Sequence, residues 1–102
     1  MDSKASGDLI DPLAIKEFIE KYASPKAIAA WRKSGPFRYP YIEDNEVKLT
    51  IRQFYDPQYE CHYFGQCNQQ TREPHGRGIE IDDEGSISEG YWKEGVLAGP
   101  GL

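Results

Sequence analysis

The chain has 102 residues, of which 38% are hydrophobic and 13% aromatic, so we expect one modest core that depends on a few large rings. Its net charge of -5 lies in one half, because residues 1–51 carry 8 basic and 8 acidic side chains whereas residues 52–102 carry 4 and 9. The acidic half disfavours nucleic acid and anionic membrane lipid as partners, and two cysteines are too few for a disulfide scaffold.

A flexible N-terminus is expected over residues 1–10, followed by an amphipathic helix. Asp11-Pro12 supplies an N-cap and a proline at the first helical position, where its missing N–H costs nothing. Apolar residues then recur at the i, i+3, i+4 and i+7 spacing, which places them on one face of a helix of about three turns. These residues are Ile15, Phe18, Ile19 and Tyr22.

A second short helix is predicted over residues 25–33, because Ser24-Pro25 repeats the start signal and Gly35-Pro36 ends the helix. We therefore expect a helical cap over residues 11–35. Its apolar faces either cover one end of the following sheet or contact a partner, and both alternatives use the same face. The apolar side of the second helix consists of Ala27, Ile28 and Trp31.

An extended aromatic arm is predicted over residues 36–46. Phe37, Tyr39 and Tyr41 alternate along this segment, and two prolines, which cannot donate a hydrogen bond to a sheet, interrupt it. The three rings are either a contact surface for a partner or a lid across the helix pair.

Antiparallel β-hairpins are predicted over residues 47–102. Val47–Tyr55 is rich in β-branched residues and alternates in polarity, so it is the clearest strand. After a turn at Asp56-Pro57, the chain returns as a second strand over residues 59–65. An irregular loop is expected over residues 66–74.

A second hairpin follows this loop. Its strands are residues 78–81 and 86–92, and the acidic residues 82–85 form the turn between them. A third strand is predicted to begin at Gly99. The predicted fold class is therefore α+β, with a short helix pair followed by antiparallel hairpins.

A fixed period links the glycines of the acidic half. His75-Gly76-Arg77-Gly78 is echoed 23 residues later by Ala98-Gly99-Pro100-Gly101. Such a period is typical of repeat units that bury their apolar faces against their neighbours. The chain also contains the spacing Gly-x-Trp, followed by a glycine three residues later and Gly-x-Gly four residues beyond. Its matching residues are Gly90, Trp92, Gly95, Gly99 and Gly101.

With these residues the chain resembles the MORN-repeat family over residues 59–102. The chain departs from the family pattern at three places. Ser88, two residues before Gly90, stands where MORN repeats usually have a tyrosine, and Cys67 replaces the tryptophan of the preceding copy. The segment of residues 66–74 is two residues longer than the family pattern allows. The resemblance implies hairpins stacked as a MORN-type meander with an aromatic-lined groove that acts as a contact surface. It also implies a protein without chemistry of its own, because no residues remain for a catalytic domain.

No catalytic, metal or cofactor site is expected. Cys61 and His62 are neighbours on a strand, so their side chains point to opposite faces and cannot pair as nucleophile and base. Together with Cys67 and His75 they match no zinc-ligand spacing. The acidic turn at residues 82–84 lacks the alternating oxygen ligands of a calcium loop.

These features predict a non-catalytic structural subunit or adaptor of a larger protein assembly, ciliary or cytoskeletal in nature. The last repeat stops at Leu102, so we expect an open sheet edge that another subunit or a second copy covers. The alternatives are a phosphoinositide or membrane-surface binding module and an accessory subunit of an organellar membrane complex. The predicted protein-binding residues are Tyr63, Tyr91, Trp92, Gly99, Gly101, Leu102, Phe37, Tyr39 and Trp31, and the predicted repeat-structural glycines are Gly65, Gly76, Gly78, Gly85, Gly90 and Gly95.

An intracellular location is expected, because the beginning of the chain lacks an export signal and no segment is apolar enough to span a membrane. The cytoplasm or cytoskeleton is the predicted compartment, with a cilium or flagellar axoneme favoured and a mitochondrion as the alternative. The amino-acid sequence of Asp83–Lys93 resembles the repeats of protist MORN proteins.

Overall fold

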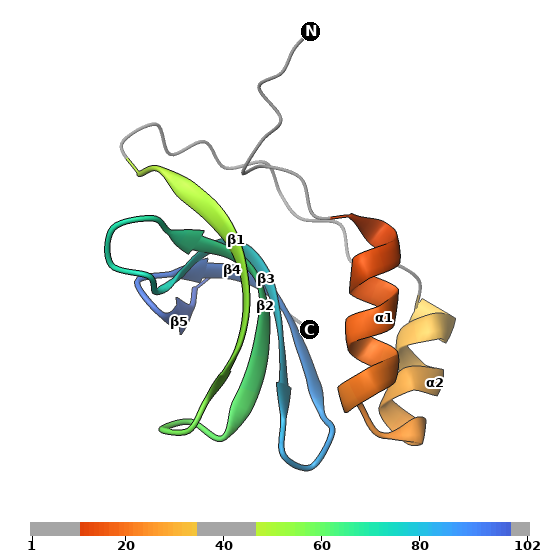
Figure 1. Cartoon of the computed structure of the whole chain (residues 1–102). Coiled ribbons are helices and arrows are strands. Elements are labelled where there is room, and N and C mark those ends of the chain that lie inside the picture. Colours follow the sequence, from red (N-terminus) through yellow and green to blue (C-terminus); the bar gives the residue numbers. More distant parts are fainter. Residues whose placement is uncertain (1–10, 35–46, 99–102) are drawn as a thin grey trace, which may run out of the picture.

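The computed structural model describes residues 11–34 and 47–98, which form two helices followed by one antiparallel sheet of five strands (Figure 1). Each strand pairs with the next one along the chain, so the sheet is a meander with the order β1-β2-β3-β4-β5. The predicted α+β class is confirmed. The elements are α1 (Pro12–Tyr22), α2 (Pro25–Ser34), β1 (Leu49–Asp56), β2 (Cys61–Asn68), β3 (Pro74–Asp82), β4 (Ile87–Lys93) and β5 (Val96–Leu97).

The first helix, α1, begins at the predicted position. The Asp11 carboxylate accepts a hydrogen bond from Leu13 N at 3.1 Å, which satisfies an N–H that has no partner inside the helix. Phe18 and Ile19 of the predicted apolar stripe are 3% and 0% exposed. The helix therefore covers the sheet with the face that its sequence spacing predicts.

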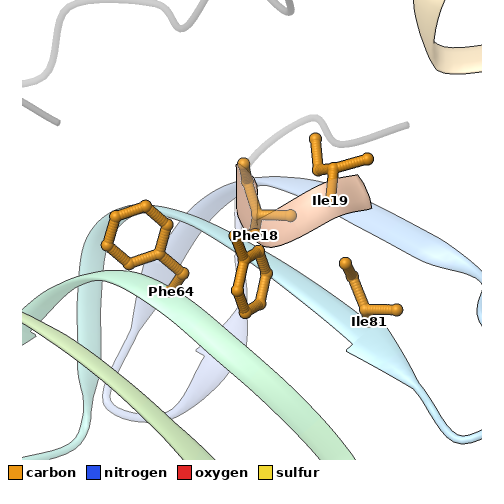
Figure 2. Packing of buried hydrophobic residues seen from close by; sticks show 5 residues of the cluster. Phe18, Ile19, Phe64 and Ile81 are labelled. Carbon is orange, nitrogen blue, oxygen red and sulfur yellow. The ribbon is translucent and has the colours of Figure 1, made fainter. Parts of the chain in front are cut away.

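The main core lies between α1 and one face of the sheet, the helix-facing face (Figure 2). Phe18 contacts Phe64 of β2, with 5.4 Å between the ring centroids. Ile79 of β3 lies opposite Phe64 in the strand register, and both belong to the buried cluster together with Ile81. Full burial of each such side chain stabilises the fold by about 1.5–3 kcal/mol.

The second helix, α2, is anchored through the elbow between the helices. Ser24 Oγ accepts a hydrogen bond from Ala27 N at 3.1 Å and so caps the helix, while Ser24 N donates to the carbonyl oxygen of Gly85 at 3.0 Å. Ile28 and Trp31 pack on the main core but remain half-buried. In the described residues the helix pair thus covers the sheet, chiefly through α1. Of the two predicted alternatives, a cover for the sheet or a contact with a partner, the structure contains the first.

The loop between β2 and β3 is shorter than predicted. β2 continues to Asn68 because the pairing register with β3 shifts between Gly65 and Cys67, which keeps the strand paired beyond the glycine. Asn68 Oδ1 then accepts hydrogen bonds from the backbone N–H groups of Gln70 and Thr71 and closes the turn. The irregular loop predicted over residues 66–74 is therefore corrected to residues 69–73.

The last described strand begins earlier than predicted, at Val96 rather than at Gly99. Lys93 pairs with Val96 across a two-residue loop, Glu94-Gly95, in which both residues have positive φ (50° and 87°). Two positive φ values are the requirement of the tightest β-hairpin turns, and they let the strand reverse at once.

Several predictions fall on residues outside the described ranges. They are the flexible segment at residues 1–10, the aromatic arm at residues 36–46 with Phe37 and Tyr39, and the residues Gly99, Gly101 and Leu102.

Candidate functional site

A second buried cluster lies on the opposite face of the sheet, which we call the outer face. It contains Tyr63, Cys67 and Trp92, with Phe54 and Leu97 packed against them. Side chains alternate along a strand, so Tyr63 points away from the face that Phe64 shares with α1. Figure 1 shows a curved sheet with both helices on one side and β5 on the other.

A row of glycines makes room for the outer-face rings. Gly65, Gly78 and Gly90 lie directly opposite one another on β2, β3 and β4. A Cβ added at Gly78 would lie 2.6 Å from Tyr63 Cε1, so the ring occupies the space that a side chain would take. Tyr63 Oη donates a hydrogen bond to the carbonyl oxygen of Gln66 at 2.7 Å. Because these glycines have no side chains, the Tyr63 ring can pack against the sheet and be buried on the face away from the helices.

Trp92 completes this cluster. Its ring meets Tyr63 edge to face, with 5.5 Å between centroids and an interplanar angle of 89°. Trp92 lies opposite Gly76 in the register of β3 and β4. Its indole Nε1–H is buried and has no acceptor in the described part of the chain.

The burial of these rings corrects one expectation about the binding surface. Tyr63 and Trp92 are 2% and 4% exposed, so they are core side chains and not groups that a partner touches on an open surface. The physical reason is the glycine row, which lets the sheet bury its own aromatic rings. Tyr91 remains half-buried.

The outer face carries a pocket with a volume of about 210 Å³, which we call the acidic pocket. The β1–β2 turn, the segment leading into β3 and the β4–β5 turn surround it. Tyr59 and Val96, which line the pocket, are 66% and 65% exposed. Its other rings are Phe54, Tyr63 and Trp92.

Four carboxylates line the acidic pocket, and no basic side chain among the described residues does so. They come from four places in the chain, the end of β1, the segment before β3, β3 itself and the β4–β5 turn. Within the described residues none of the four forms an ion pair. They are Asp56, Glu73, Glu80 and Glu94.

One of these carboxylates is coupled to a thiol. Cys61 Sγ donates a hydrogen bond to Glu80 Oε2 at 2.8 Å. Burial and this carboxylate raise the pKa of the Cys61 thiol to about 12, and burial raises the pKa of the Cys67 thiol to about 11. Both thiols are therefore protonated at neutral pH, whereas nucleophilic attack and metal binding require the thiolate.

The other residues weighed as ligands lie apart. His62 stacks on Tyr22 of α1 with 3.7 Å between ring centroids, whereas Cys61 contacts Glu80 on the outer face, so these neighbours point to opposite faces as predicted. No group of three or more potential metal ligands occurs within residues 11–34 and 47–98.

A larger cavity of about 510 Å³ lies between α2 and the start of β4. It places Trp31, one of the predicted protein-binding residues, beside Ala27 and Ile87. The indole Nε1–H of Trp31 is buried without an acceptor among the described residues.

Of the residues that line the acidic pocket, the sequence singled out Tyr63 and Trp92 as protein-binding, Gly95 as a repeat glycine and Cys61 as a thiol that was set aside. It singled out none of the four carboxylates. Tyr59, Glu73 and Glu94 lie in or beside turns that are far apart in the chain, and no periodicity connects them. The one available signal was the excess of acidic residues in the second half. Charge counting identified the acidic half but not the place where its side chains converge.

No protein-family model, no curated protein and no solved structure matches the chain. None of the described helices is long and apolar enough to cross a membrane.

Proposed function

We propose that this chain is a non-catalytic docking subunit that binds a protein partner through the acidic pocket of its outer face. The observation that carries the proposal is the combination of four carboxylates, without an ion-pair partner in the described residues, and exposed apolar side chains around one concavity. A protein surface with basic residues complements this charge, and the exposed Tyr59 and Val96 offer apolar area for contact.

The size of the pocket supports a protein partner. Its volume of about 210 Å³ is below the roughly 300–1,000 Å³ of pockets that enclose drug-sized ligands and cofactors. A single side chain of a partner suits this volume better than a cofactor does. The thiol that lines the pocket, Cys61, is protonated and therefore is not an activated nucleophile.

The setting of this subunit is part of the proposal. The resemblance to MORN repeats supports a place in a ciliary or cytoskeletal assembly, with an organellar membrane complex as the alternative. The acidic pocket argues against the phosphoinositide alternative, because carboxylates repel phosphate groups.

The proposal is tested by affinity purification of the tagged full chain from its native cells after mild cross-linking. Glu73→Lys/Glu94→Lys reverses two exposed pocket charges, and Glu17→Lys/Glu84→Lys makes the same charge change at exposed positions outside the pocket. We expect the wild type and the control variant to retain the same partner proteins and the pocket variant to lose them. Partners that survive the pocket variant, or a wild-type chain that purifies alone, would refute the proposal.

A further inference from the structure

We propose that the acidic pocket receives an arginine side chain from an exposed segment of the partner. This inference rests on the proposed docking function and names the group that is recognised. It follows from three properties of the pocket, namely the distribution of its carboxylates, its aromatic lining and its small volume.

The carboxylates favour a cation with several donors. Asp56, Glu73 and Glu94 lie at three separate turns or strand ends around the pocket, so acceptors are offered from different directions. Glu80 also lines it, but its Oε2 already accepts the Cys61 thiol, and Asp56 Oδ1 accepts the backbone N–H of Gln58 at 2.9 Å, which leaves Asp56 Oδ2 for a ligand. A guanidinium presents five N–H donors in one plane, whereas an ammonium presents three donors on a compact and strongly hydrated centre.

The aromatic lining favours the same group. Phe54 lines the pocket, and the guanidinium of Arg52 in the same chain already lies over its ring, with Cζ 4.5 Å from the centroid. Arg52 Nη1 donates to the Arg72 carbonyl oxygen at 2.9 Å, which holds this arginine in place beside the pocket. Arg52 already occupies one face of the Phe54 ring, so the aromatic side chain left open to a partner's guanidinium is the exposed Tyr59. A guanidinium plane stacks on such a ring.

The volume limits the occupant to one side chain. About 210 Å³ leaves no space for a helix or a second strand inside the pocket. The exposed Tyr59 and Val96 would cover the apolar stem of the arginine while its charged end meets the carboxylates.

Each of the two cavities contains one tryptophan, whose NMR signal reports on that cavity alone. Trp92 lines the acidic pocket, and Trp31 lines the cavity beside α2. Because the two indole rings lie in different cavities, their Nε1–H groups give separate NMR signals, each of which responds to its own surroundings.

The test is an NMR titration of the ¹⁵N-labelled full chain with acetyl-Gly-Gly-Arg-Gly-Gly-amide, with the lysine peptide and the uncharged citrulline peptide as comparisons. We expect the arginine peptide to shift the Trp92 indole signal saturably and to leave the Trp31 signal in place. The lysine peptide should bind about three- to fivefold more weakly, and the citrulline peptide should cause no saturable shift. Equal binding of the arginine and lysine peptides, no binding, or an equal shift of Trp31 would overturn the inference.

A matched pair of variants ties the result to the pocket. Glu73→Gln/Glu94→Gln removes two exposed pocket carboxylates and should abolish the saturable shift, whereas Glu17→Gln/Glu84→Gln should leave it unchanged. An unchanged shift in the pocket variant would overturn the inference. If cellular partners depend on the pocket charges but the arginine peptide shows no preference, the inference fails and the docking function stands. If the chain has no partner, the docking function fails.

Discussion

The ring of Tyr63 lies against Gly78 of the neighbouring strand, at a distance that a Cβ on residue 78 would not permit. This contact explains why a tyrosine is 2% exposed on the face of the sheet away from α1 and α2. The hydroxyl remains satisfied, because it donates to the Gln66 carbonyl oxygen. The glycine of the repeat pattern is therefore a packing requirement of the outer face.

Replacement of Gly78 by alanine should destabilise the fold by about 2–4 kcal/mol, because the new Cβ overlaps the Tyr63 ring. Gly95→Ala is the matched control, since the nearest atom to its added Cβ is 3.9 Å away and only its positive φ opposes a side chain. That control should cost about 1–2 kcal/mol. Urea unfolding followed by tryptophan fluorescence measures both values, and equal losses would contradict the role of the Tyr63 contact.

Gly85→Ala should loosen the helix pair from the sheet. Its Cβ would lie 2.5 Å from Ser24 N, and this residue joins the elbow between α1 and α2 to the β3–β4 turn. We expect a loss of about 2–3 kcal/mol, and faster amide hydrogen exchange in both helices than in β2. Uniformly faster exchange in all elements would show that the contact stabilises the whole fold and not the helix pair in particular.

Phe18→Ala should cost about 3–5 kcal/mol, because it removes a buried ring that contacts Phe64. Leu13→Ala on the same helix is the control, as Leu13 is 60% exposed and should change stability by at most about 0.5 kcal/mol. Thermal unfolding followed by circular dichroism distinguishes the two. Similar losses for both variants would mean that α1 packs in a different orientation.

The raised thiol pKa values predict a fold that weakens in alkali. The folded state holds its thiol protons to a pKa of about 12 at Cys61 and about 11 at Cys67, whereas the ordinary pKa of a thiol is 9.0. The unfolded chain therefore loses these protons first as the pH rises. Stability should be fully retained below pH 9 and should fall above it, by up to about 1.4 kcal/mol per pH unit for each thiol.

Urea unfolding at a series of pH values measures this slope. Cys61→Ala should lessen it between pH 9 and 11, since one of the two titrating thiols is then absent. As an independent measurement, iodoacetamide should alkylate the native chain at pH 8 far more slowly than the urea-unfolded chain. A slope that Cys61→Ala leaves unchanged would show that other groups cause the alkaline loss.

The elements that depend on local patterns could be predicted from the sequence. Asp11-Pro12 and Ser24-Pro25 mark the starts of the two helices because caps and prolines act within one turn. The spacing of Phe18 and Ile19 indicated the buried face of α1 for the same local reason. The extent of β2 and the position of β5 could not be read in this way, since a register shift and a turn with two positive φ values decided them.

The sequence by itself determined the helix pair, the antiparallel hairpins and the glycine spacing, because each depends on residues that are close in the chain. Only the tertiary structure decided that Tyr63 and Trp92 are buried and that acidic side chains converge at a pocket beside these two rings. The alignment of Gly65 with Gly78 across two strands makes room for the buried Tyr63 ring. Glu73 and Glu94 meet at one pocket because β3 and β4 are antiparallel neighbours, and Gly95 N donates a hydrogen bond to the Pro74 carbonyl oxygen at 2.9 Å. Such relations depend on strand register and curvature, which local sequence patterns do not specify.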